Sequence, residues 1–162
     1  HFAQLLEDRP GTEPMDDEDG EELYCTASWL EKHGQEEHAE RLFVRLAERP
    51  DAGERAWCLA LAARYKKLGR FDRAVPLWES IVACTEYGLL PKTDAFVELA
   101  MHHEHRTKDL SRALDYAKRA LAMLGRRARM NRANASLSDE REKLHRRIER
   151  LEARMNRAAD RG

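Results

Sequence analysis

The chain has 162 residues, of which 42% are hydrophobic and 36% are charged, and its net charge is -1. This length and apolar content are enough for one domain with one core, and no apolar run approaches the roughly 18 residues of a membrane-spanning helix. We therefore expect a soluble, cytoplasmic protein with no membrane partner. Because the first residue is a histidine and not a methionine, we also expect it to be part of a longer protein.

The net charge conceals a division along the chain. Residues 1–105 carry 12 Lys and Arg against 22 Asp and Glu, whereas residues 106–162 carry 17 against 8. A basic C-terminal end can bind nucleic acid or an acidic partner. It can equally be the solvated surface of helices, and the sequence leaves both interpretations open.

The N-terminal region, residues 1–22, reads as a connection and not as part of a core. "HFAQLL" is typical of the last turns of a helix that belongs to something upstream. Residues 7–22 contain nine acids against one arginine, together with two prolines and two glycines. So few apolar groups cannot offset the entropy of ordering the chain, so this stretch is predicted to be an acidic linker.

Residues 23–125 show a helical pattern that repeats. Residues 27–43 and 62–78 align without a gap at an offset of 35, and residues 100–117 form a third copy with one extra residue in its turn. The small residues allow two antiparallel helices to approach closely, and the glycines can end a helix in the left-handed conformation. The aligned positions are Ala27 with Ala62 and Ala100, Leu30 with Tyr65 and His103, Gly34 with Gly69, Ala39 with Ala74 and Ala113, and Phe43 with Trp78.

This spacing resembles the tetratricopeptide repeat, a helix-turn-helix unit of about 34 residues. The resemblance implies an all-α, tetratricopeptide-like α-solenoid of about three helix hairpins. We expect residues 126–162 to form a basic connection and a C-terminal capping helix. The third copy departs from the pattern, because Thr107 and Lys108 stand where a glycine is expected. Pro76 lies in the second helix of the second copy, where we expect it to fall in or near the first turn.

Two blocks carry a second resemblance, "RYKKLGRFDRAVPLWE" (residues 64–79) and "VELAMHHEHRTKD" (residues 97–109). They are similar to the C-terminal helical-repeat region of bacterial proteins with an N-terminal RNase H-like, DEDD-type exonuclease domain. The resemblance implies that the catalytic carboxylates belong to an upstream domain and that this chain is a non-catalytic scaffold. Its partner would then be another protein or the nuclease domain.

Chemistry-bearing motifs are scarce. The sequence contains no phosphate-binding glycine loop, no Gly-x-Ser-x-Gly elbow and no Cys-x-x-Cys, so we expect no enzyme activity and no cofactor. Cys25, Cys58 and Cys84 fall inside apolar stretches, which predicts reduced core thiols. We expect no metal either, although a site built on His102, His105 and Glu98 stays open as an alternative.

The residues around the third turn are predicted to have structural roles. His103 aligns with Leu30 and Tyr65, so it should pack between helices. Asp109 is placed to cap the helix that follows, and Glu104 and Lys108 have the spacing of an ion pair within a helix. The positions of the second resemblance that we interpret as structural are Glu98, Glu104, His105, Arg106, Lys108 and Asp109.

The C-terminal helix is predicted to cover the exposed apolar side of the third repeat. Its apolar seam consists of Leu137, Leu144, Ile148, Leu151 and Met155, and Ser136 or Ser138 is the expected N-cap. A dimeric coiled coil is the alternative cover, although barely three heptads make it marginal.

Two surfaces are candidates for binding. The first helices of the repeats would form a concave face for a protein, with Arg64, Tyr65, Lys66 and His102 as lining residues. A basic stripe at the C-terminal end would hold nucleic acid by its backbone, because no aromatic residue is interleaved for base stacking. The stripe comprises Arg126, Arg127, Arg129, Arg132, Lys143, Arg147, Arg150, Arg154, Arg157 and Arg161.

Overall fold

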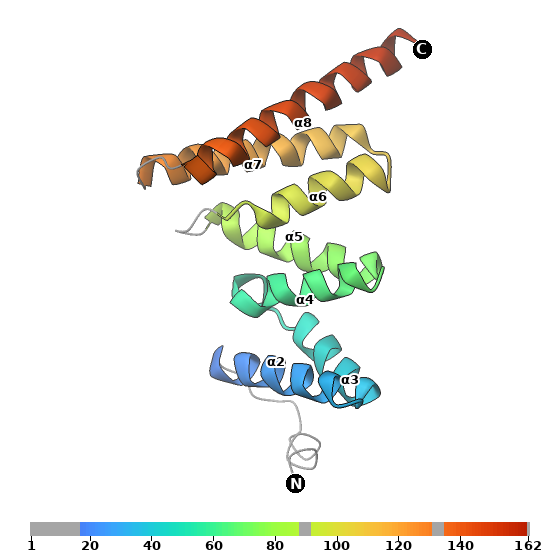
Figure 1. Ribbon diagram of the computed structural model, residues 1–162, viewed down its shortest axis with the longest axis vertical. Helices are drawn as coiled ribbons and strands as arrows, with labels where there is room; N and C mark the ends of the chain where they lie inside the picture. The colour runs from blue at the N-terminus through green and yellow to red at the C-terminus, as the bar shows by residue number, and fades with distance from the viewer. Residues whose placement is uncertain (1–16, 88–91, 131–134, 162) are drawn as a thin grey trace. The chain divides into compact units, whose positions relative to one another are not determined.

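The structure, a computed structural model, describes residues 17–87, 92–130 and 135–161 (Figure 1). Throughout these ranges the regular elements are helices, which confirms the predicted all-α class. None of these helices has both the length and the apolar character that crossing a membrane requires. The chain forms two compact units, residues 1–48 and 49–162, and each is described by itself.

The first unit contains α2 (Asp17–Lys32) and α3 (Glu36–Ala47), which pack against each other. The predicted linker is wrong in its last part, since α2 already begins at Asp17. Carboxylates in the first turns of a helix interact favourably with its macrodipole, so an acidic stretch can begin a helix. The expected upstream helix and the rest of the linker lie outside the described residues.

The turn between α2 and α3 has the geometry that the repeat pattern predicts. Gly34 has a φ of +81°, in the left-handed region. The backbone N–H of Gly34 donates to the carbonyl of Glu31, and that of Gln35 donates to Leu30. These two bonds form a Schellman motif, which satisfies carbonyls that the end of the helix leaves free.

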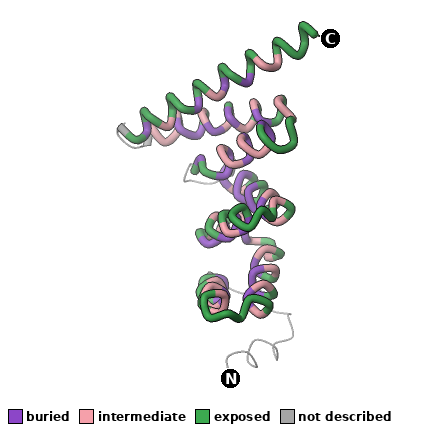
Figure 2. The backbone as a smooth tube through the Cα atoms, turned by 45° about the vertical axis from the view of Figure 1, so that its right-hand side comes forward, coloured by how far each residue is buried: buried purple, intermediate pink, exposed green. Residues whose placement is uncertain are grey.

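The second unit is a series of helices in which each packs on the next (Figure 1). Short turns join α4 to α5 and α6 to α7, so the members of each pair are antiparallel neighbours. Figure 2 shows that the buried residues of α8 lie on its side toward α7, while its outer side is exposed. The elements are η1 (Ala52–Glu54), α4 (Ala56–Lys67), α5 (Phe71–Tyr87), α6 (Asp94–His105), α7 (Leu110–Met130) and α8 (Ala135–Asp160).

Alanines line the crossings of all three helix pairs. In each pair one alanine of the first helix and one of the second are completely buried, as the alignment predicts. With only a methyl group at these points, the helix axes can approach closely, and larger residues such as Phe43 and Trp78 fill the remaining volume. The alanines are Ala27 and Ala39, Ala62 and Ala74, and Ala100 and Ala113.

The turn of the third pair is built differently from the others. Gly69, between α4 and α5, has a φ of +73° and a Schellman motif like that of Gly34. Between α6 and α7 the left-handed residue is Lys108, with a φ of +58°. The Thr107 hydroxyl accepts a bond from the Asp109 N–H (3.3 Å), and the Asp109 carboxylate accepts one from the Arg112 N–H (3.1 Å). Asp109 therefore caps α7, as predicted.

Two predicted helix boundaries are wrong, and Pro76 lies near the first turn of α5 but not in it. Packing of the apolar face must therefore compensate the backbone hydrogen bond that proline cannot donate. Residues 126–130 form the last turns of α7 and not a connection. The helix α8 begins at Ala135, so Ser136 and Ser138 lie within it and not at its N-cap.

The cysteines differ in environment more than the sequence suggests. All three are free. Cys58 is buried, and desolvation raises the pKa of its thiol to about 12, so it is an inert core residue as expected. Cys84 is half-buried, and the prediction that all three lie in the core is wrong for Cys25, which is exposed.

Candidate functional site: the arginines of α8

The apolar seam of α8 is buried within the chain. Leu137, Leu144, Ile148 and Leu151 are each at most 9% exposed. Ile148 and Leu151 share a core cluster with alanines of α6 and α7. Intramolecular packing thus covers these four residues, as predicted, while Met155, the last residue of the predicted seam, is half-buried.

A buried glutamate of α6 fixes the position of α8. Its side chain, Glu104, is 1% exposed. One carboxylate oxygen accepts a bond from the Arg147 guanidinium (2.6 Å), and the other accepts from Arg150 (2.7 and 2.9 Å). Arg154 adds a longer contact of 3.7 Å. We call Glu104, Arg147, Arg150 and Arg154 the Glu104 cluster.

The helical period explains how three arginines reach one carboxylate. Arg147, Arg150 and Arg154 are spaced by three and four residues, so they project from the same face of α8. Forked guanidinium groups bind carboxylates with more geometric specificity than ammonium groups do. The cluster therefore determines how α8 is aligned along α6, in addition to the non-directional contacts of the seam.

The Glu104 carboxylate is held in its ionised form. Desolvation by burial acts to raise its pKa, but hydrogen bonds from Arg150 and Arg147 and their positive charges outweigh that, and the pKa lies below its usual value of 4.5. A depressed folded-state pKa stabilises the fold at pH values above 4.5. This contribution is lost as the pH falls through the folded-state pKa.

The predicted pairing of Glu104 with Lys108 is wrong. Lys108 lies in the turn, after the end of α6, and adopts the left-handed conformation, while the Glu104 carboxylate is directed to α8. His105 is exposed, with its Nε2 atom 3.7 Å from a Glu104 oxygen. The guanidinium of Arg106 stacks over the Phe71 ring at 3.8 Å.

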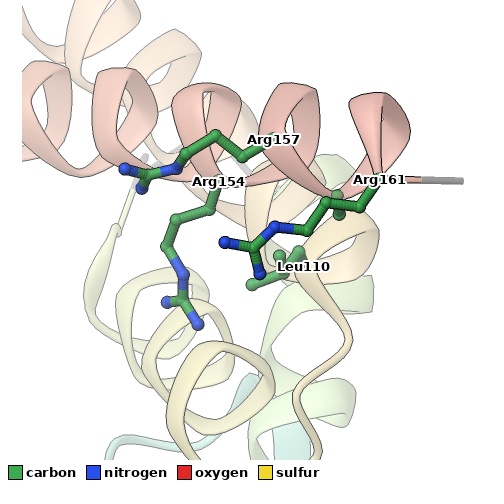
Figure 3. A pocket seen from close by; sticks show the side chains of 5 residues that line it. Leu110, Arg154, Arg157 and Arg161 are labelled. Carbon is green, nitrogen blue, oxygen red and sulfur yellow. The ribbon is translucent and has the colours of Figure 1, made fainter.

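Beyond the Glu104 cluster, the end of α8 and the start of α7 border a groove (Figure 3). Its volume is about 320 Å³. Arg161 extends from α8 toward Leu110 and Arg154 extends away from α8 beside it, while the guanidinium of Arg157 points along α8, away from Leu110. Arg157 and Arg161 are exposed, and neither forms an ion pair with a described residue. We call this site the arginine groove; its lining is Leu110, Arg154, Arg157, Ala158 and Arg161.

The predicted basic stripe is therefore divided, because many of its members have acidic or polar contacts. Arg147 and Arg150 bind Glu104. Arg127 lies 3.4 Å from Glu140, and Lys143 lies 2.9 Å from Asp139. At the end of α7, Arg126 approaches the Met123 sulfur (3.6 Å) and Arg129 donates to the Gly125 carbonyl (3.4 Å), while Arg132 lies outside the described residues. Of the described members of the stripe, Arg157 and Arg161 are the exposed arginines whose side chains have neither kind of contact.

The four residues predicted to line the concave face have different environments. Tyr65 is completely buried and cannot line a binding surface, so this prediction is wrong. The guanidinium of Arg64 lies 5.1 Å from the centre of that ring. Lys66 is exposed and bridges from α4 to Glu98 of α6 at 2.7 Å. His102 is half-buried and stacks on Phe71, with 5.4 Å between ring centres.

The histidines near the end of α6 take part in packing. His103 is buried, as predicted, stacks on Tyr116 at 5.7 Å and shares a 3.0 Å hydrogen bond with the Thr107 hydroxyl. The pKa values of His102 and His103 are lowered, mainly because burial disfavours the charged ring. Among the described residues, no group of three or more His, Cys, Asp or Glu is placed to hold a metal ion.

Sequence reasoning missed the Glu104 cluster, although two signals for it were present. Glu104 directly follows His103 in the sequence, and Lys66 directly follows the aligned Tyr65. A charged residue at the same place in both copies indicates a charged position at the edge of the core. Three arginines at spacings of three and four residues can all face such a position. A uniform basic stripe has the same spacing, so only the docking of α8 distinguishes the two arrangements.

Comparison with known proteins gives one informative similarity. The uncharacterized protein YprB of Bacillus subtilis (strain 168) is 34% identical to this chain over 131 residues. These residues are 80% of the chain but 29% of the relative, so the chain spans less than a third of that protein. No family model matches, and no solved structure matches.

Proposed function

We propose that this chain is a non-catalytic, tetratricopeptide-like interaction module of about three helix hairpins and a capping helix. The observation that carries the proposal is the ion pair between Lys66 and Glu98. It bridges α4 and α6, the first helices of two consecutive pairs, and Ala63 and Met101 on the same helices are not buried. The side of the fold that carries these residues, which we call the first-helix face, can therefore meet a partner. We define this face by Ala63, Lys66, Glu98 and Met101.

The recurring packing of the helix pairs supports the repeat interpretation. Each pair buries alanines at equivalent positions and reverses its chain at a left-handed residue. Units of this kind bury their apolar surface by stacking, which leaves extended faces available to a partner. The composition of the first-helix face, with small, charged and apolar residues, suits a protein partner.

The partner is proposed to be another protein or the nuclease domain of the same polypeptide. The second possibility rests on the resemblance to the repeat region of RNase H-like, DEDD-type exonuclease proteins. It agrees with the presence of a much longer curated relative, of which 71% lies outside the matched segment. That unmatched part is therefore the first protein to test.

Binding between this chain and the unmatched part of the Bacillus protein can be measured by isothermal titration calorimetry. Ala63 is exposed on α4, so an Ala63→Arg variant should obstruct the face without disturbing the core. The matched control is Ala83→Arg, at an exposed position of α5. We expect micromolar or tighter binding that Ala63→Arg weakens at least about tenfold. Absence of binding, or equal loss in both variants, would contradict the proposal.

A further inference from the structure

The arginine groove has more positive charge than the fold uses. In the Glu104 cluster one carboxylate faces three guanidinium groups, which leaves an excess of two positive charges. Arg157 and Arg161 add two more. Of the acids on this part of α8, Glu152 is engaged by Lys118 at 3.5 Å, while Glu149 and Asp160 offset part of the excess. Residues 147–161 hold five arginines against three acids, so the end of α8 keeps a net positive charge next to the groove.

The arginines of the groove form a regular row. Arg154, Arg157 and Arg161 follow one another at spacings of three and four residues, so they share a face of α8 and span roughly 10 Å along its axis. Each strand of a nucleic acid duplex carries one phosphate per about 3.4 Å of axis. A row of this length can face two or three consecutive phosphates.

The arginines of the groove stand beside apolar side chains. Leu110 and Ala158 line the groove with them, and the long aliphatic stems of arginine pack well on such surface. The planar guanidinium also matches the oxygens of a phosphate, with which it forms two parallel hydrogen bonds.

We propose that the arginine groove is a binding site for the phosphate backbone of a nucleic acid strand, with Arg157 and Arg161 as the principal contacts. An evenly spaced row of cations fits an evenly charged polymer better than a peptide, which usually needs an apolar anchor pocket. The groove contains no aromatic side chain, so it contacts the backbone and does not discriminate between base sequences.

Fluorescence anisotropy of labelled 20-nucleotide DNA and RNA, single- and double-stranded, tests this site with the full 162-residue chain at about 50 and 150 mM salt. The variant Arg157→Glu/Arg161→Glu removes two arginines that form no ion pair with a described residue. The matched control is Arg41→Glu/Arg45→Glu on α3, which changes the net charge equally. It also replaces two exposed arginines four residues apart on one helix.

We expect binding at low salt that weakens at least about tenfold in Arg157→Glu/Arg161→Glu, with little change in the control. For a single strand, the slope of log K against log salt should become shallower by about 1.4, because two phosphate contacts are lost. Absence of binding at low salt, or equal loss in the two variants, overturns the proposal. Binding of a polyglutamate peptide without binding of any oligonucleotide also overturns it, and identifies an acidic protein as the occupant. The first-helix face is untouched by these variants, so this result is separate from the test of protein docking.

Discussion

The same repeat position carries opposite chemistry in the α4–α5 pair and in the α6–α7 pair. Lys66 and Glu104 each follow a buried ring, Tyr65 and His103, and each reaches from the first helix of its pair to the next layer of the fold. Lys66 has a side chain that is 42% exposed and bridges to Glu98 of α6. Glu104 is 1% exposed and binds arginines of α8.

The difference shows how a series of packed helix pairs can end. Between the two helix pairs of the second unit, packing of α5 on α6 makes the connection, and the Lys66 bridge is an exposed addition of small energetic value. At the C-terminal end, α8 packs on α7 and combines its apolar seam with a buried, directional ion cluster. Burying Glu104 makes the fold depend on its arginine partners, since a buried charge without partners is costly.

The largest effect should come from removing the charge of Glu104. We expect Glu104→Gln to lower the free energy of unfolding by about 3 kcal/mol, because three guanidinium groups lose a buried partner. The equivalent substitution Lys66→Gln should cost less than about 1 kcal/mol, because that pair is exposed. Urea unfolding followed by circular dichroism measures both. Equal costs for the two substitutions would show that burial does not distinguish the two sites.

A smaller effect is expected from pH. Because the pKa of Glu104 is depressed by its arginines, its contribution to stability is complete above pH 4.5 and declines as the pH falls below that value. The free energy of unfolding, measured between pH 6 and pH 3, should therefore fall less steeply in Glu104→Gln than in the wild type. The Glu98→Gln variant, altered at the exposed bridge, is the control and should keep the steep fall. If the Glu104→Gln profile matches the wild type, the ionised state of Glu104 is not a source of stability.

The turns of the two pairs should give the smallest effects, and these should have opposite signs. Gly69→Ala places a side chain in the left-handed region and should cost about 1 kcal/mol. Lys108→Gly relieves the same strain and should stabilise the chain by roughly 0.5 kcal/mol. Thermal unfolding of the two variants measures both changes in stability. Destabilisation by Lys108→Gly would show that the lysine side chain contributes more than its backbone strain costs.

Much of this architecture could be predicted from residue spacing. Repeated small residues, with Gly34 and Gly69 in the turns, indicated the helix pairs, and the period of the α8 seam indicated a covered helix. Helix ends were predicted less well, because an acidic stretch such as residues 17–22 is compatible with a linker and with a helix N-terminus. The binding of Arg147 and Arg150 to Glu104 was not predictable. Helical spacing shows which residues share a face, but it does not show which residues of other helices lie opposite that face.

The most direct test of the central claim is a pair of double-mutant cycles, measured as free energies of unfolding. One cycle combines Glu104→Gln with Arg147→Gln, and the other combines Lys66→Gln with Glu98→Gln. If the buried cluster fixes α8 to the end of the series of helix pairs, the first coupling energy should be about 2 kcal/mol and the second below about 0.5 kcal/mol. A coupling between Glu104 and Arg147 as small as that between Lys66 and Glu98 would contradict the account, and would leave the apolar seam as the attachment of α8.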